Sequence, residues 1–362
     1  MEYIFKDVLD IKNGKNQREV ECPDGQYPIY GSGGVMGYAS DYICEADTVI
    51  IGRKGSINNP IYAEEPFWNV DTAFGLCAKK DILLPKYLFY FCIKFDFERL
   101  NRTVTIPSLT KSDLLKIKIQ VPSLDVQQEV IDKLTKIESI LNFRKQELKL
   151  LDELVRGRFV ELFGDPELNP MGWEKVTLND VCSSIVRGPF GSALKKEFFV
   201  EPSETTYKVY EQKHAIQKSA SIGTYYITQE KYRELKRFEC LSGDILMSCS
   251  GTMGELYQLP EGCEKGIINQ ALCKFTLNDK ILPVCFLVYM QQTIGKLETK
   301  GSGIQNIAAV SYIKQMPINL PPMEVQKKFE RFVKQIDKSK FRGFSMLTTM
   351  KSAYEQQTLI YP

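Results

Sequence analysis

Apolar residues along this chain follow two different periods. Short apolar runs that end at small polar residues and glycine, such as Asp244-Ile245-Leu246-Met247 before the turn at Ser250-Gly251, predict buried strands that run into tight turns. Two longer stretches, which begin near residues 125 and 325, place apolar residues alternately four and three positions apart. Because an α-helix turns once in about 3.6 residues, this spacing predicts two long amphipathic helices.

Each of the two helices carries one apolar stripe. The stripes contain Leu134, Ile137, Leu141, Leu148 and Leu151 in the first helix and Phe329, Phe332, Ile336, Met346 and Met350 in the second. Alternation of four and three is typical of a coiled-coil seam, in which two helices bury their stripes against each other. The alternative is that each helix packs only on its own domain. Two matched helices in one chain favour mutual pairing, so we expect these residues to form the seam.

The glycine turn occurs twice in the chain. Residues 47–58, DTVIIGRKGSIN, are similar to residues 243–254, GDILMSCSGTMG, and the likeness extends over most of the sequence. The stretches VPSLDVQQEV at 121–130 and LPPMEVQKKF at 320–329 then open the two helices. An internal repeat of this kind predicts two similar globular domains, each followed by a helix. We predict an α+β fold with globular domains at residues 1–122 and 166–321, and with long helices at residues 123–165 and 322–362.

Composition narrows the class of protein. The 362 residues include 47 basic and 45 acidic ones, a net charge of +2, so a nucleic-acid-binding function would need local basic loops rather than a global positive field. Ten cysteines without a C-x-x-C pair and a single histidine leave few ligands for zinc, and we expect no metal site. Free thiols, the lack of a signal peptide and the lack of any long apolar run favour a soluble cytoplasmic protein that does not contact a membrane.

Catalytic motifs are missing from the sequence. No G-x-x-x-x-G-K-[ST] loop is present to bind ATP phosphates. Leu320-Pro321-Pro322-Met323 lacks both the polar residue and the aromatic ring of an aminomethyltransferase motif. His214 follows Lys213 without a flanking acid, and we expect it to lie on the surface rather than to activate a nucleophile. We therefore predict that the chain is not an enzyme.

The two glycine turns are the candidate binding loops. A strand followed by a glycine turn is also a common structural element, so one copy alone would carry little weight. The side chains add weight, because Arg53, Lys54 and Ser56 in one loop, and Ser248, Ser250 and Thr252 at the corresponding place in the other, can bond to phosphates or base edges. Further candidate DNA-binding residues are Arg102, Lys111, Arg187, Lys195, Lys196, Lys300, Gln305 and Asn306.

These motifs, taken together and in this order, resemble the specificity subunit of type I restriction-modification systems over essentially the full length. The resemblance rests on the two glycine-turn motifs, on Ile268-Asn269-Gln270-Ala271-Leu272, on the helix entries Pro122/Gln127 and Pro321/Gln326, and on the stretch from Leu154 to Phe159 with Phe163-Gly164-Asp165. The first half departs from the pattern at Asn58, where the second has Gly254, and at Asp71-Thr72, where the second has Asn269-Gln270.

The resemblance implies a function without catalysis. Each globular domain would be a target recognition domain that reads half of a split site in double-stranded DNA. The two helices would pair as an antiparallel coiled coil, set the spacer and bind two methyltransferase subunits. No cofactor would bind to this chain; S-adenosylmethionine would belong to the methyltransferase subunits, and ATP with Mg²⁺ to restriction or translocase subunits where these are present.

Two other functions compete with the DNA-specificity function. The chain could be a scaffold whose repeated domains bind other proteins, which predicts no sequence-selective DNA binding in the presence of its partner. It could also be a fragment of a fused methyltransferase-nuclease, but the required motifs are missing.

Overall fold

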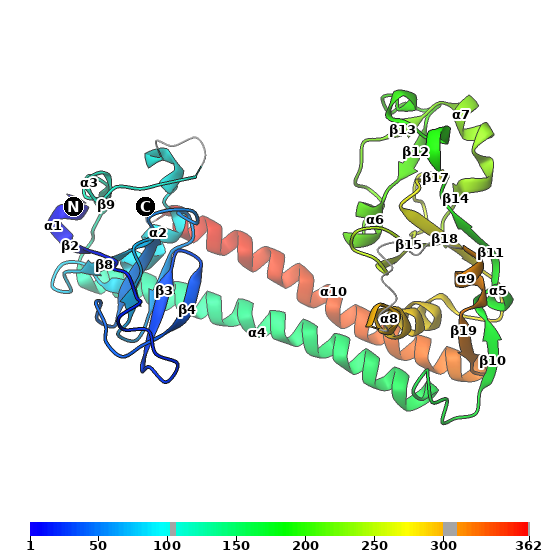
Figure 1. Ribbon diagram of the computed structural model, residues 1–362, viewed down its shortest axis with the longest axis horizontal. Coiled ribbons are helices and arrows are strands. Elements are labelled where there is room, and N and C mark those ends of the chain that lie inside the picture. Colours follow the sequence, from blue (N-terminus) through cyan, green and yellow to red (C-terminus); the bar gives the residue numbers. More distant parts are fainter. Residues whose placement is uncertain (102–105, 300–309, 361–362) are drawn as a thin grey trace. The chain divides into compact units, whose positions relative to one another are not determined.

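The structure, a computed structural model, describes residues 1–101, 106–299 and 310–360. It divides into two compact units, the first made of Met1–Glu147 with Gly343–Pro362 and the second of Leu148–Arg342 (Figure 1). Both units combine helices with sheets, which confirms the α+β class predicted from the sequence.

The largest sheet of the first unit has the strand order β2-β8-β5-β6, with neighbours antiparallel. These strands are Leu9–Asn13, Ala73–Ala78, Thr48–Gly52 and Ile61–Ala63. A second sheet has the order β4-β3-β7, at Gly34–Ala39, Tyr27–Gly31 and Trp68–Asn69, and its strands β3 and β7 are parallel. Strands β1 (Glu2–Ile4) and β9 (Lys118–Gln120) pair separately. The shorter helices are α1 (Phe5–Val8), α2 (Pro85–Lys94), the 3₁₀ helix η1 (Phe97–Leu100) and α3 (Lys111–Leu114).

The second unit repeats this topology. Its sheets have the orders β11-β18-β15-β16 and β13-β12-β17-β14, with a separate pair β10-β19, and β12 and β17 are parallel like β3 and β7. The strands are β10 (Glu174–Thr177), β11 (Cys182–Arg187), β12 (Tyr207–Tyr210), β13 (Tyr226–Ile227), β14 (Glu239–Cys240), β15 (Ile245–Ser248), β16 (Leu256–Gln258), β17 (Gly266–Ile268), β18 (Leu272–Leu277) and β19 (Pro317–Leu320). The shorter helices are α5 (Leu178–Val181), η2 (Gly191–Ala193), η3 (Lys196–Phe198), α6 (Gln212–Ile216), α7 (Gln229–Glu234), η4 (Lys236–Phe238), α8 (Pro283–Thr299) and α9 (Val310–Gln315).

Strands β5 and β15 form because their apolar residues face two cores at once. In β5, Val49 and Ile51 enter the main core of the first unit while Ile50 enters a smaller core on the opposite face. In β15, Ile245 and Met247 enter the main core of the second unit while Leu246 faces the other side. Successive side chains of a strand point to opposite faces, so a run without polar positions is required at a strand covered on both sides.

Strand pairing fixes which loop residues of the two units correspond. Gly52 lies opposite Ala73 in the first unit, and Ser248 lies opposite Leu272 in the second. Gly52 therefore corresponds to Ser248, Arg53 to Cys249 and Lys54 to Ser250. This register agrees with the sequence comparison, which set GRKGS at 52–56 beside SCSGT at 248–252.

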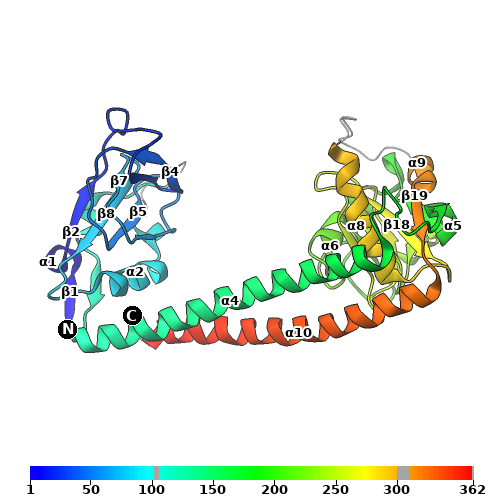
Figure 2. The same ribbon diagram turned by 90° about the horizontal axis from the view of Figure 1, so that it is seen from below.

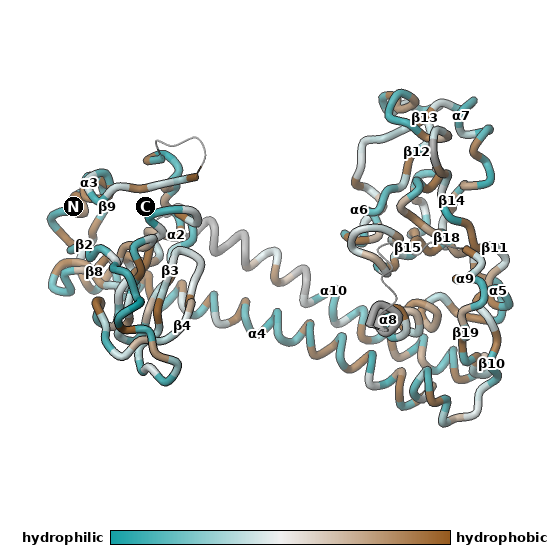
Figure 3. The backbone as a smooth tube through the Cα atoms, viewed as in Figure 1, coloured by the Kyte–Doolittle hydropathy of each residue, from teal (hydrophilic) through white to brown (hydrophobic). Residues whose placement is uncertain are grey.

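The two long helices are α4 (Leu124–Phe163) and α10 (Met323–Ile360). Along α4, hydrophobic and hydrophilic residues alternate as the sequence period predicts (Figure 3). In the second unit, the rings of Phe163 and Phe329 lie 5.3 Å apart at one end, and Asp152 pairs with Lys340 at 2.6 Å further along. Residue numbers rise in one helix as they fall in the other, so this segment of the pair is antiparallel.

The predicted seam residues have different surroundings. Leu134 packs in the core of the first globular fold with Val130 and Ile131, which corrects its assignment to the helix seam. Phe329 lies in the main core of the second unit, where Phe332 and Ile336 pack against it. Met346 is half exposed and accepts a hydrogen bond from Arg144 within the first unit. The remaining seam residues are half-buried: Ile137, Leu141, Leu148, Leu151 and Met350.

Candidate nucleic-acid interface

The glycine loop of the first unit follows β5 and is held by its own backbone. Arg53 N donates to Thr72 O at 2.7 Å, and Leu109 N donates to Arg53 O at 2.9 Å. Gly55 N donates to Pro107 O at 3.0 Å. The loop is therefore fixed between the segments around Thr72 and Pro107, which lie far from it in the sequence.

Two glycines of this loop cannot be replaced without strain. Gly55 has φ +80°, a conformation that residues with a β-carbon rarely adopt. A β-carbon on Gly52 would lie 2.3 Å from the carbonyl oxygen of Ser56. The tight backbone leaves Arg53, Lys54 and Ser56 exposed, with the Arg53 guanidinium 5.8 Å from the ring centre of Phe74. The loop thus presents two cations and a hydroxyl on a rigid support.

The equivalent loop of the second unit shares one of these backbone bonds and the glycine with positive φ, and its side chains differ. Cys249 N donates to Ala271 O at 2.8 Å, as Arg53 does to Thr72, and Gly251 has φ +62°. Ser250 is half-buried and Thr252 is exposed. This loop offers hydroxyls where the first offers charges.

Ser248 was predicted as a DNA contact, and its position contradicts that assignment. Its side chain is fully buried, its hydroxyl donates to Thr252 O at 2.6 Å, and it accepts from Glu255 N at 2.9 Å. Both bonds close the turn from inside. Ser248 therefore stabilises the loop and does not present its hydroxyl to a ligand.

The position of Arg187 also contradicts its predicted role as a DNA contact. Only 7% of this residue is exposed, and its guanidinium lies 5.1 Å from the ring centre of Phe190. Its burial follows from the last position of β11, where the side chain points inward. Arg187 therefore belongs to the interior of the second unit rather than to a phosphate-binding surface.

The other predicted contacts are surface residues or lie outside the described residues. Lys111 is exposed, and its ammonium donates to Ile11 O at 2.6 Å. Lys195 and Lys196 are exposed, and Lys195 lies 3.6 Å from Glu197. Arg102, Lys300, Gln305 and Asn306 fall outside the described residues.

His214 is buried, which contradicts its predicted place on the surface. Its Nδ1 accepts from Glu211 N at 2.8 Å, and its Nε2 lies 2.7 Å from Ile222 O, to which it donates in this tautomer. Burial lowers its pKa below the ordinary value, so the ring is neutral near pH 7. The single histidine of the chain thus connects the start of α6 to the loop that follows that helix.

Residues that the sequence did not point to form a cluster of lysines and aromatic rings in the second unit, in which each lysine is also paired with a glutamate. Lys231 lies 4.2 Å from the ring centre of Phe198, Lys213 lies 5.4 Å from that of Tyr225, and Lys236 lies 5.1 Å from that of Tyr232. Mixed aromatic and basic residues are common on nucleic-acid-binding surfaces. The segment EKYRELKRF at 230–238 carries this composition and was a usable signal.

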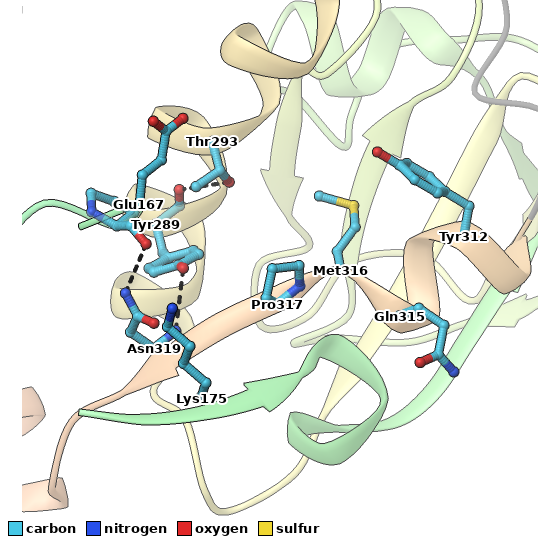
Figure 4. Close-up of a pocket in the computed structure, with 10 residues that line it drawn as sticks. Glu167, Lys175, Tyr289, Thr293, Tyr312, Gln315, Met316, Pro317 and Asn319 are labelled. Carbon is cyan, nitrogen blue, oxygen red and sulfur yellow. Dashed lines mark hydrogen bonds between the residues drawn. The ribbon is translucent and has the colours of Figure 1, made fainter. Parts of the chain in front are cut away.

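A cavity of about 390 Å³ lies among α8, α9 and β19 in the second unit (Figure 4). Asn319 Nδ2 donates to Pro166 O at 2.8 Å, and Asn319 N donates to the Tyr289 hydroxyl at 3.2 Å. Its polar lining groups therefore fasten the segment after α4 to β19. The lining residues include neither cysteine nor histidine.

Two further observations concern the described part of the chain. Among these residues, no group of three or more His, Cys, Asp or Glu side chains is placed to hold a metal ion. The helices formed by the described residues are also too short or too polar to span a bilayer.

Known proteins share both the sequence and the fold. The sequence model of the family described as "Type I restriction modification DNA specificity domain" matches residues 1–152 and 170–342. A protein of Haemophilus influenzae named as a type I restriction enzyme specificity subunit is 25% identical over 358 residues, which cover 93% of this chain and 86% of that protein.

Two solved structures have the same fold. The crystal structure of the type I restriction-modification system S subunit from M. genitalium matches with a TM-score of 0.61 at 16% identity and covers 100% of this chain and 96% of that one. A chain from a structural study of type I R-M complex assembly and conformational transition matches with a TM-score of 0.61 at 14% identity, over 99% of this chain and 96% of that one. With the family match over both halves and the repeated topology, these findings show that the chain belongs to the type I restriction-modification DNA specificity family.

Proposed function

We propose that the chain is the DNA-specificity subunit of a type I restriction-modification complex and that each unit reads one half of a bipartite site in double-stranded DNA. The observation that carries this proposal is the repeated glycine loop, which has an equivalent backbone bond and a glycine with positive φ in both units but different side chains. Arg53 and Lys54 occupy the places of Cys249 and Ser250. Charged and neutral side chains recognise different base edges, so one scaffold can supply two specificities.

The low net charge of the chain supports a specificity subunit that binds DNA as part of a complex. A net charge of +2 gives little long-range attraction to the phosphate backbone. Affinity then depends on local cations such as Arg53 and Lys54 and on contacts made by partner subunits. We expect the isolated chain to bind DNA weakly and the assembled complex to bind its site tightly.

We further propose that α4 and α10 set the spacer between the half-sites and dock two methyltransferase subunits. Large apolar side chains in contact with water support the docking. On α4, Phe143, Leu150 and Leu154 are 68%, 55% and 50% exposed, and on α10 Phe341 is 77% exposed. Groups of exposed apolar residues are typical of protein-protein interfaces.

In this proposal the chain contributes no catalytic group. S-adenosylmethionine binds to the methyltransferase subunits, and ATP with Mg²⁺ binds to restriction or translocase subunits where the complex contains them. The complex acts on DNA in the cytoplasm. The role of this chain is to select the site at which its partners act.

Sequencing of methylated bases tests the proposal. The chain is expressed together with the methyltransferase subunit encoded beside it, recognised by an Asn-Pro-Pro-aromatic motif. We expect a methylated bipartite sequence that is missing from cells without the chain. Exchange of residues 1–120 for those of a relative should change one half-site only. A chain that binds its partner yet gives no sequence-selective methylation would be a protein-interaction scaffold instead.

A further inference from the structure

Ser32 and Gln212 occupy the same position in the two units. The parallel strands β3 and β12 end with equivalent bonds, because Val70 N donates to Tyr30 O at 3.0 Å and Asn269 N donates to Tyr210 O at 2.9 Å. Two residues after these tyrosines the chain reaches Ser32 in the first unit and Gln212 in the second. The sequence comparison did not align these residues, because the segments around them have little in common.

Both residues lie against the glycine with positive φ in the candidate binding loop. A β-carbon on Gly55 would lie 3.7 Å from the Ser32 hydroxyl, and a β-carbon on Gly251 would lie 3.2 Å from Gln212 Nε2. A polar side chain that follows a strand of the neighbouring sheet thus lies next to each glycine loop. This side chain differs between the units, as the loop side chains do.

The Gln212 amide has bonding capacity left for a ligand. Its Nε2 donates to Thr252 O at 3.4 Å, and its Oε1 accepts from the Ser250 hydroxyl at 3.5 Å. Both bonds are long, and the residue is only half-buried. A carboxamide has two N–H donors and two oxygen lone pairs, so one donor and one acceptor remain. This pair matches the N7 acceptor and N6 donor on the major-groove edge of adenine.

The backbone that carries Gln212 is held in place. His214, two residues later, is fully buried, with its Nδ1 bonded to Glu211 N and its Nε2 bonded to Ile222 O. The ring therefore binds the chain on both sides of Gln212 and Lys213. A side chain on a fixed backbone loses less conformational freedom when it binds, which favours selective recognition.

We propose that Gln212 is a specificity-determining residue of the second unit and reads the edge of an adenine beside the glycine loop, with Ser32 at the equivalent position in the first unit. This inference rests on the proposed function, since it names the base that one unit selects. The proposed recognition site therefore includes the glycine loop, which the sequence repeat indicates, and also a segment that is remote from this loop in the sequence.

The test uses the full chain assembled with its methyltransferase subunit and a DNA library randomised at each position of both half-sites. For the wild type we expect an adenine requirement at one position of one half-site. Gln212→Ala should relax that requirement by about 5- to 150-fold and leave the other half-site unchanged. Gln212→Glu should shift the preference toward cytosine, because a carboxylate accepts from the cytosine amino group.

Gln217→Ala is the matched control, because Gln217 is an exposed glutamine directly after α6. It should methylate like the wild type, and melting temperatures confirm that all variants fold. Wild-type methylation without sequence preference would overturn the proposed function. If the wild type is selective and Gln212→Ala keeps the wild-type sequence preference, the assignment of Gln212 is wrong. A Gln212→Ala variant that loses activity equally on every base would assign the residue a structural role and overturn the inference too.

Discussion

Gln127 and Gln326 make the same hydrogen bonds in the two units. Gln127 Oε1 accepts from Leu84 N at 2.8 Å, and Gln326 Oε1 accepts from Leu282 N at 2.8 Å. Each Nε2 donates at 2.9 Å to a carbonyl shortly before α2 or α8, that of Ile82 or Lys280, and at 2.9 Å to a proline carbonyl before its own helix. Both side chains are buried. A single amide therefore fastens the start of each long helix to its globular fold.

Removal of either amide should destabilise the unit that contains it. Gln127→Ala and Gln326→Ala leave buried backbone groups without partners, and we expect each to lower the free energy of unfolding by about 1–3 kcal/mol. Urea denaturation of the full chain measures this change. Gln128→Ala is the control, because Gln128 is exposed and its amide donates to Asp132 one turn later in the same helix. Equal stability of Gln127→Ala and Gln128→Ala would contradict the assigned role.

The repeat and its buried strands were predictable because they depend on local pattern. Residues 47–58 and 243–254 keep apolar runs before a glycine turn, and such a run is required wherever a strand is covered on both faces. The helix entries share Gln127 and Gln326 because both must satisfy the same backbone groups. These features can be found by a comparison of the two halves of the sequence, without knowledge of the fold.

The inward or outward direction of single side chains was not predictable. A one-residue shift of register moves a strand residue to the opposite face, and β11 has an irregularity between Cys182 and Ser184. Arg187 is buried as a result of the register beyond that point. Ser248 aligns with Gly52 in the sequence, but only the structure shows that its hydroxyl points inward and bonds to Thr252 O. Contacts such as Gln212 with Gly251 join segments that no sequence period connects.

A buried ion pair distinguishes the second unit from the first. Lys274 Nζ lies 3.2 Å from Asp244 Oδ2, and both side chains are nearly inaccessible. The strand register places Thr48 and Gly75 at the equivalent positions, where a β-carbon on Gly75 would lie 2.5 Å from Cys44 Sγ. The first unit thus fills this space with a thiol and the second with an ion pair.

Asp244→Ala should cost about 3 kcal/mol of unfolding free energy, because it leaves the Lys274 ammonium buried without its counter-ion. The double variant Asp244→Leu with Lys274→Met should recover most of that loss, since apolar side chains need no counter-ion. Chemical denaturation of the full chain distinguishes the two. A double variant that is less stable than Asp244→Ala would show that the charges themselves contribute net stability.

The burial of His214 predicts that the stability of the chain decreases as the pH falls. Burial lowers its folded-state pKa below the value of 6.5 that applies in the unfolded chain. Between these two values the unfolded chain binds more protons, so stability is complete above pH 6.5 and falls as the pH decreases. The groups around the ring are Tyr210, Lys208 and Glu211, with Lys213 beside it.

The measurement is the unfolding free energy of the full chain from about pH 5 to 7.5. His214→Gln should be less stable than the wild type at pH 7 and should show a smaller slope below pH 6.5, since the variant lacks the imidazole. The difference between the two slopes isolates His214 from all other titrating groups. Identical slopes would mean that the ring becomes protonated without loss of its bonds to Glu211 and Ile222.

Arg53 and Lys54 should contribute to DNA binding in different ways. If Arg53 contacts a guanine edge, Arg53→Ala costs about 1–3 kcal/mol and relaxes one base position. If Lys54 contacts a phosphate, Lys54→Ala weakens binding to all sequences alike and reduces the salt dependence by about one unit. Titrations of the assembled complex at several salt concentrations measure both. Lys80→Ala is the control, because Lys80 is exposed beyond the opposite end of β8. Wild-type affinity and specificity in both loop variants would remove this loop from the interface.

The last prediction concerns the proposed spacer function of α4 and α10. One heptad is added to α4 between Leu141 and Leu148 and one to α10 after Gly343, the turn at which Arg144 contacts Met346. Seven residues keep the apolar period and lengthen each helix by roughly 10 Å, a length of about three base pairs at roughly 3.4 Å each. Three base pairs also rotate the groove by about a third of a turn. We therefore expect the preferred spacer to lengthen by roughly two to four base pairs with lower affinity.

A methylation assay on split sites with graded spacers measures this shift, and the half-site sequences should stay the same. A heptad in α4 alone is the control, because it lengthens one helix without the other and should weaken assembly with the methyltransferase subunits. An unchanged spacer preference in a folded, partner-bound double insertion would mean that another part of the complex sets the distance. Loss of one half-site in place of a longer spacer would instead indicate that the helices orient the units without measuring the gap between them.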